Sequence, residues 1–396
     1  MTASSRLSLQ YVLLFGATGV SLPFAGLWLG GQGFDGVQIG VLLAAPMLAR
    51  LATGPLIAQW ADRFRLRRTP IALLGIVGSA GYALAAATDI FPLVAAGWFI
   101  GATSAAALIP LVDVLNLTTA RREGHAFSVS RGFGSAAFVV ANVIMGAMLL
   151  QLPVDAVVVW VILAGLLFTL AGWCVLPPDP VSEPASAPAR GDTRRLLADS
   201  RFMIAILAVG CIQSAHAFYY GFSALIWKNQ GISEDRTGLL WAFSVVVEIG
   251  FMWWVEPWRR RIGIGARTML LIGAGAAVLR WLALAFSPPL ALLWPLQALH
   301  ALSFAVTYLA GIQLVERFSP PGTHTAAQTL SSVASSGVLM GLATLASGPL
   351  YDRFAQGGYL AMAVLAAIGG LAALGLRYDG AGAGATCGPQ WRPPQP

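Results

Sequence analysis

Twelve apolar runs divide the chain, each close to the length that crosses a lipid bilayer. They cover residues 8–29, 37–59, 70–87, 91–115, 127–150, 154–176, 202–227, 237–257, 267–286, 290–314, 326–349 and 358–378. A helix needs about 20 apolar residues to span the hydrocarbon core. Only 10% of the 396 residues are charged, whereas soluble domains carry about 25%. We therefore predict an all-α membrane protein with twelve transmembrane helices.

The runs fall into two sets of six, separated by the longest polar connection. Residues 177–200 are rich in Pro, Ser and Ala and carry several charges, a composition typical of a linker. The sequence thus predicts an N-terminal six-helix half over 1–176, a cytoplasmic linker over 177–200, a C-terminal half over 201–379 and a disordered cytoplasmic tail over 380–396.

The distribution of Lys and Arg indicates the orientation in the membrane. With both termini in the cytoplasm, 18 of the 24 basic residues lie in inner segments, and only Lys228, Arg236 and Arg353 lie in outer loops. Cytoplasmic loops are enriched in Lys and Arg. Arginine is in large excess over lysine, which suggests a bacterial genome, so we predict a multi-pass protein of the bacterial inner membrane. The basic residues form no continuous face, which argues against nucleic-acid binding.

An internal repeat relates the two halves. Gln32-Gly33 recurs as Gln230-Gly231, 198 residues later, and the same offset pairs Arg50 with Glu248. Parallel repeats are one of the known transporter designs. A second similarity, between residues 54–64 and 348–354, places its two copies on opposite sides of the membrane in this topology, so we do not interpret it as part of the repeat.

The loop after the second run resembles the signature of the major facilitator superfamily in weakened form. Its residues are Gly54, Asp62, Arg63, Arg67 and Arg68, and the glycine usual after Asp-Arg is missing. Within the superfamily, residues 28–50, 227–248 and 297–304 resemble the phenylpropionate permease group, which is related to lactose permease and the nucleoside–proton symporters. This resemblance implies two pseudo-symmetric six-helix halves, alternating access and proton symport. We expect a monomer.

Charged side chains inside the apolar runs are the first candidates for function. Each costs about 2.5–3.5 kcal/mol at a helix centre, so such residues face a cavity or a partner. Glu248 can exist protonated or ionised, which proton coupling requires. Arg280 offers a planar fork that holds carboxylates. The resemblance to the lactose permease group assigns proton coupling loosely to Glu248, Arg280 and His300. The alternative is a buried ion pair that only holds helices together.

Candidate substrate-binding residues lie on three of the runs. Gln297, His300 and Phe304 are spaced to share one helix face. The superfamily lines its cavity with helices one, four, seven and ten, which adds His216, Tyr219 and Tyr220 on the seventh run. Arg50 completes the predicted set. Ordinary aromatic packing and an interhelical hydrogen bond remain the alternatives for the tyrosines and the histidines.

Four charged residues are candidate gate elements. Asp62, at the inner end of the second run, looks like the superfamily's gate aspartate, which would favour the positive N-terminus of a helix near residue 326. Arg63 follows it directly. Asp113 and Arg131 lie toward the cytoplasmic side of neighbouring antiparallel runs, where they could pair.

The sequence carries no enzyme signature. Residues 31–36 match GxGxxG, but without a strand before them the match has no meaning. The cysteines lack metal-ligand spacing. We predict a transporter without a catalytic or metal site, without a cofactor, and with the proton as coupling ion.

The predicted function is proton-coupled uptake of a small organic substrate. An anion is favoured because the intramembrane arginines Arg50, Arg131 and Arg280 outnumber the acids Asp113 and Glu248. The resemblance to the phenylpropionate permease group implies the same and favours an aromatic acid such as phenylpropionate. The alternatives are proton-driven efflux of drugs or metabolites, symport of a sugar or a nucleoside, and a membrane enzyme or sensor that does not transport.

Overall fold

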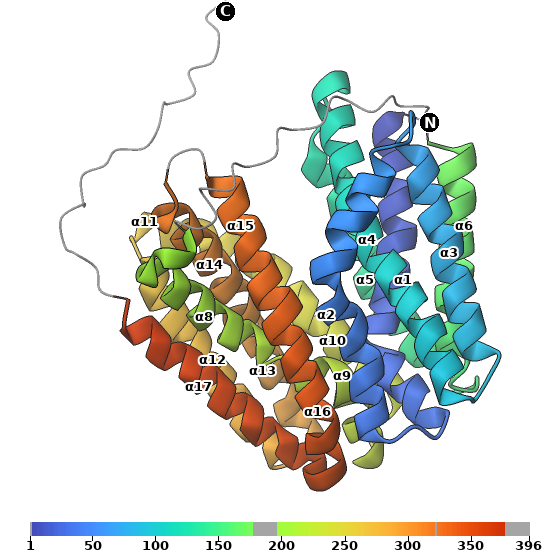
Figure 1. Ribbon diagram of the computed structural model, residues 1–396. Helices are drawn as coiled ribbons and strands as arrows, with labels where there is room; N and C mark the ends of the chain where they lie inside the picture. Colours follow the sequence, from blue (N-terminus) through green and yellow to red (C-terminus); the bar gives the residue numbers. More distant parts are fainter. Residues whose placement is uncertain (1, 177–195, 321–322, 377–396) are drawn as a thin grey trace, which may run out of the picture.

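The computed structural model is helical and describes residues 2–176, 196–320 and 323–376 (Figure 1). The N-terminal half contains α1 (Ala3–Gly31), α2 (Gly36–Ala61), α3 (Arg68–Ala86), α4 (Phe91–Glu123), α5 (Phe127–Met148) and α6 (Ala156–Cys174). The C-terminal half contains α8 (Ser200–Ser214), α9 (Ala217–Asn229), α10 (Glu234–Gly250), α11 (Glu256–Arg261), α12 (Ala266–Ala285), α13 (Leu290–His300), α14 (Thr307–Phe318), α15 (His324–Ser332), α16 (Met340–Phe354) and α17 (Tyr359–Leu374).

Short segments join the C-terminal helices into six crossings. Three π-helical segments, η1 (Phe251–Val255), η2 (Ala301–Val306) and η3 (Val333–Leu339), continue α10, α13 and α15 into the helices that follow. The seventh crossing instead breaks between α8 and α9. In the N-terminal half each crossing is one uninterrupted helix. Because π-helical turns are frequent at functional sites, the C-terminal half is the place to look for one.

The prediction of twelve transmembrane helices is confirmed. Among the described residues, eleven apolar helical stretches are long enough to span a membrane, and the last, Ala326–Leu374, has 49 residues. The turn η4 (Ala355–Gly358) divides that stretch into two crossings. α4 continues eight residues beyond the predicted end at 115, because its last turns are polar and therefore lie outside the apolar run. It ends at Gly124, whose left-handed φ of 70° favours glycine. The predicted tail and most of the predicted linker lie outside the described residues.

The two halves are in contact at the ends of the helices opposite the start of α1. We call these ends the opposite face, and the ends where α1 and α8 begin the N-terminal face. α1 packs on α9, α2 on α16 and α5 on α10. Glycines lie where the backbones approach most closely. A Cβ on Gly26 would lie 1.8 Å from the carbonyl oxygen of Gly221, and one on Gly238 would lie 2.3 Å from that of Asn142.

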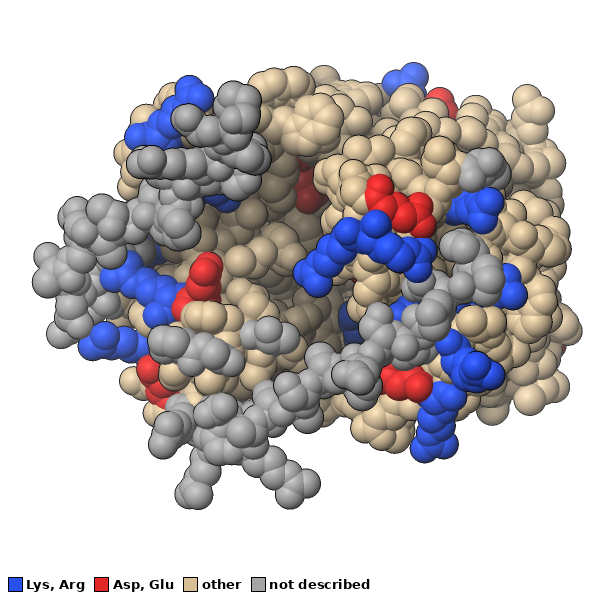
Figure 2. Space-filling view, turned by 90° about the horizontal axis from the view of Figure 1, so that it is seen from above, with Lys and Arg blue, Asp and Glu red and all other residues tan. Residues whose placement is uncertain are grey.

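Toward the N-terminal face the halves separate. The second half of α2 no longer packs against the C-terminal half, and its side chains Leu51 and Leu56 are 56% and 62% exposed. The view onto this face has a hollow between the two halves, with Lys and Arg side chains around it (Figure 2). The molecule is therefore closed on the opposite face and open on the N-terminal face.

The close approach of α1 and α9 gives a first testable prediction. We expect Gly26→Ala to destabilise the protein by about 1–3 kcal/mol, the usual cost of overpacking, because the added methyl group would overlap the backbone of Gly221. The matched control is Gly16→Ala on the same helix, where a Cβ meets nothing within 4 Å. Thermal unfolding of the purified variants measures both. Equal midpoints for the two would contradict this account of the interface.

Candidate functional site

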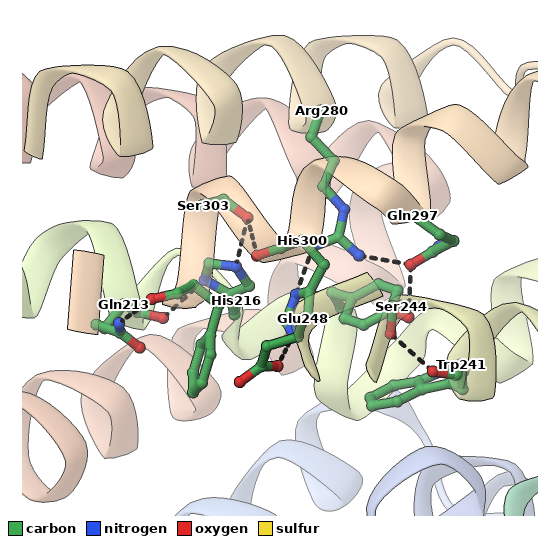
Figure 3. A network of polar contacts seen from close by, with 11 residues as sticks. Gln213, His216, Trp241, Ser244, Glu248, Arg280, Gln297, His300 and Ser303 are labelled. Atoms are coloured by element: carbon green, nitrogen blue, oxygen red, sulfur yellow. Dashed lines mark hydrogen bonds and ion pairs between the residues drawn. The ribbon is translucent and has the colours of Figure 1, made fainter. Parts of the chain in front are cut away.

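A chain of polar side chains crosses the C-terminal half from its core toward the space between the halves (Figure 3). Glu248 Oε2 lies 3.6 Å from His300 Nε2. Arg280 Nη1 lies 3.0 Å from His300 Nδ1, and Arg280 Nη2 donates to Gln297 Oε1 at 2.7 Å. Three crossings supply these residues, through α10, α12 and α13. The structure thus brings Glu248, Arg280 and His300 together, and their role in proton coupling stays a prediction.

Arg280 is the innermost member of this chain. Its side chain is fully buried, and its guanidinium carbon lies 4.5 Å from the ring centre of Tyr219 and 4.6 Å from that of Trp281. Aromatic faces attract a cation, and more strongly when water is excluded. The two rings and the hydrogen bonds hold the guanidinium in one orientation, with one edge toward His300.

Arg280 has no carboxylate in direct contact within the described part of the chain. Glu248 is the acid linked to it, through the neutral imidazole of His300. Several donors around Arg280 also lack an acceptor: its own Nε, the Nε2 of Gln297 and the Nε1 of Trp281. Buried donors without partners are rare in folded proteins. The surroundings of Arg280 are therefore rich in donors and poor in negative charge.

His216 occupies the break in the seventh crossing and is fully buried. Its Nδ1 lies 3.2 Å and 3.1 Å from the carbonyl oxygens of Ile212 and Gln213, in the last turn of α8. Its Nε2 lies 3.1 Å from the hydroxyl of Ser303. The predicted substrate-binding role of His216 stays a prediction, and its contacts here are those of a residue that stabilises the break.

The remaining predicted residues of the C-terminal half form an aromatic wall beside this chain. Tyr219 is buried, donates to Gln297 Oε1 at 3.0 Å and stacks on Trp241 at 4.5 Å. Phe304 is partly exposed and stacks on the ring of His300 at 5.2 Å, with 13° between the planes. Tyr220 is also partly exposed. Phe304 and Tyr220 are thus placed to meet a ligand, whereas Tyr219 supports the arginine.

The charged residues of the N-terminal half lie elsewhere. Arg131 Nε is 3.6 Å from Asp113 Oδ1, with the two side chains 33% and 30% exposed. The hydroxyl of Tyr11 donates to the same carboxylate oxygen at 2.5 Å, and the guanidinium lies 4.1 Å from the ring centre of Phe15. The sequence predicted that Asp113 and Arg131 could pair, and the two residues do so.

The other predicted residues, on α2 or directly after it, are exposed. Arg50, Asp62 and Arg63 all have solvent-accessible side chains, and Arg50 is not paired with its repeat equivalent, Glu248, whose partner is His300. Because the halves are apart at the N-terminal face, the predicted contact between Asp62 and the start of α15 is not made in this conformation. It stays a prediction for the conformation in which that face is closed.

Sequence reasoning missed several residues of the site. Trp241, Trp281 and Ser303 hold the predicted residues in place, but an isolated Trp or Ser in an apolar helix carries no signal of its own. In the described residues, no group of three His, Cys, Asp or Glu side chains gathers as a metal site would require.

Comparison with known proteins places the chain in a family. The MFS_1 like family matches residues 4–360. A probable 3-phenylpropionic acid transporter of Escherichia coli (strain K12) is 30% identical over 367 residues, covering 91% of this chain and 94% of the relative. The maltose permease of Geobacillus stearothermophilus is 26% identical and covers 92% of each chain.

Solved structures show the same fold. The nucleoside transporter NupG superposes with a TM-score of 0.78 at 17% identity, over 95% of this chain and 98% of that one. An inward-facing bacterial homolog of the human lysosomal transporter Spinster gives a TM-score of 0.72 at 17% identity, over 96% and 98%. With its twelve crossings in two halves, this chain belongs to the MFS_1 like family and is a membrane transporter of the major facilitator fold, not an enzyme.

Proposed function

We propose that the protein is a proton-coupled symporter that takes up a small organic anion, an aromatic acid such as phenylpropionate in particular, by alternating access. The observation that carries this proposal is the buried series Arg280–His300–Glu248, in which a fixed cation is connected to a titratable acid by one imidazole.

The contacts of His300 support Glu248 as the residue that carries the coupling proton. A guanidinium can only donate, so the contact from Arg280 requires a lone pair on His300 Nδ1. The single ring proton then lies on Nε2, the nitrogen that faces Glu248. His300 cannot accept a second proton without losing Arg280. Glu248 can bind and release a proton with this arrangement intact, and its side chain is 21% exposed against 7% for His300.

Charge balance then favours an anionic substrate. While Glu248 is ionised, its charge compensates Arg280 through the neutral ring of His300. Once Glu248 is protonated, Arg280 keeps its charge in surroundings without another acid in contact. A buried uncompensated charge is unfavourable, so the site then favours an anion. A proton and a monoanion would therefore enter together and leave the site neutral.

The walls of the site support an aromatic acid. The partly exposed rings of Phe304 and Tyr220 offer apolar faces near Glu248, and aromatic rings pack well against one another. The similarity to a probable 3-phenylpropionic acid transporter points to the same class. The similarity to a maltose permease keeps a disaccharide as the second candidate.

The remaining assignments concern orientation and gating. We place both termini in the cytoplasm of a bacterium, because cytoplasmic loops are enriched in Lys and Arg. Of the basic residues predicted to lie outside the membrane core, the opposite face carries only Lys228, Arg236 and Arg353. The structure is then inward-open. Asp62 and Arg63 would act when the cytoplasmic side closes, and the exposed pair of Asp113 and Arg131 would face the cytoplasmic entrance. We expect the protein to work as a monomer.

Alkalinisation outside weakly buffered cells tests the coupling. We expect a phenylpropionate-like acid to draw protons inward, whereas a disaccharide and a nucleoside do not. Glu248→Gln should reduce the proton movement at least about tenfold, an effect of about 1.4 kcal/mol, because the amide cannot release a proton. The same variant should retain exchange of substrate for substrate, since an amide resembles the protonated acid.

Glu316→Gln is the matched control, because Glu316 is exposed near the end of α14. It should behave as the wild type. Proton movement that survives in the Glu248 variant would refute the assignment of Glu248. A response to the disaccharide alone would leave the coupling site in place and change the substrate class.

The two buried histidines should carry opposite tautomers. His300 should be protonated on Nε2, for the reason given above, and His216 on Nδ1, because that nitrogen faces two backbone carbonyl oxygens. Nitrogen NMR of protein labelled at histidine distinguishes the two forms. His216→Gln and His300→Gln provide the assignment among the four histidines. A resting His300 protonated on Nδ1 would contradict the role given to Arg280.

A further inference from the structure

The carboxylate of Asp352 connects the two halves at the opposite face. Asp352 lies in the last turn of α16, in the C-terminal half. Its Oδ1 accepts from the backbone N–H of Gly36 at 2.7 Å, and its Oδ2 accepts from that of Val37 at 2.9 Å. Both N–H groups belong to the first turn of α2, in the N-terminal half. One side chain thus makes two hydrogen bonds across the interface.

The start of α2 is shared between two acids. Its own N-cap residue, Asp35, accepts from the N–H of Gln38, and the Gln38 side chain accepts from the N–H of Asp35. Asp352 accepts hydrogen bonds from the two N–H groups between them, those of Gly36 and Val37. If the halves separate, α2 keeps its own cap and gives only the groups facing Asp352 back to water. The contact is therefore suited to forming and breaking without unwinding the helix.

Close backbone packing brings Asp352 within reach. A Cβ on Gly348 would lie 2.3 Å from the carbonyl oxygen of Gly36, and one on Gly36 would lie 2.5 Å from Asp352 Oδ1. A Cβ on Gly40 would also be tight, at 3.1 Å from the Cα of Gly348. The contact thus needs glycine at three positions, and it lies at the end of the interface where the halves are closed.

We propose that Asp352 is the gate residue that holds the opposite face shut, and that its two bonds to α2 break each time that face opens. A carboxylate favours a helix N-terminus because the partial charge there is positive, and charged acceptors make stronger hydrogen bonds than neutral ones. The proposal rests on the alternating access of the proposed function, but on neither the proton nor the substrate.

The sequence similarity between residues 54–64 and 348–354 acquires a physical meaning here. The two segments end α2 and α16, which pack against each other. Because these helices run in opposite directions, Asp62 lies at the N-terminal face and Asp352 at the opposite face. The copies are not repeat equivalents. They place one acid at each end of the same helix pair.

Distance measurements between spin labels test the proposal. The labels are attached to Asp89→Cys and Arg236→Cys, which are exposed at the opposite face in different halves, after replacement of the three native cysteines by alanine. In lipid nanodiscs without substrate, Asp352→Ala should raise the ratio of long to short distances about tenfold or more. Asp352→Asn, which keeps one acceptor oxygen and no charge, should give an intermediate ratio.

Arg353→Ala is the matched control, since Arg353 is the exposed neighbour of Asp352, whereas the two hydrogen bonds to the start of α2 come from Asp352. It should leave the distribution as in the wild type. An unchanged distribution in Asp352→Ala, or an equal shift in Arg353→Ala, would overturn the proposal. If the alanine variant is not monodisperse, Asp352→Asn decides alone. Because no substrate is added, failure of proton-coupled uptake would leave this result unaffected.

Discussion

A buried guanidinium without a carboxylate in contact is the constraint around which the C-terminal half is organised. Arg280 is fully enclosed, and a charge in such surroundings is stable only when other groups compensate it. The rings of Tyr219 and Trp281 compensate part of the charge, and His300 and Gln297 take two of its hydrogen bonds. Glu248 can supply the opposite charge through His300 when it is ionised. Changing the charge of Glu248 therefore changes the balance of the whole group.

The two halves differ in the regularity of their helices. The N-terminal half consists of continuous helices, and its charged pair, Asp113 and Arg131, lies partly exposed. The C-terminal half has a broken seventh crossing and three π-helical segments. One π-helical segment begins directly after His300, and another begins three residues after Glu248. The irregular backbone lies in the half that carries the buried arginine, and the ring of His216 lies at the break, within hydrogen-bond distance of two backbone carbonyl oxygens.

The interface between the halves is built for movement. Gly26, Gly238 and Gly348 let the backbones of the two halves approach closely on the opposite face. Asp62, at the end of α2, and Asp352, near the end of α16, would then each supply a modest electrostatic preference for closure of the face at which they lie.

The sequence by itself determined the membrane fold. Twelve apolar runs of bilayer length must form helices, because lipid offers no hydrogen-bond partners and the backbone N–H and C=O groups have to bond within each run. It also made Glu248 and Arg280 candidates for function, since a charge inside an apolar run is costly and therefore conspicuous. Only the tertiary structure decided which charges meet: Glu248 lies against His300 and not against its repeat equivalent Arg50. It also revealed the bonds of Asp352, because a contact between residues more than 300 positions apart depends on how two helices pack, and no local pattern records that.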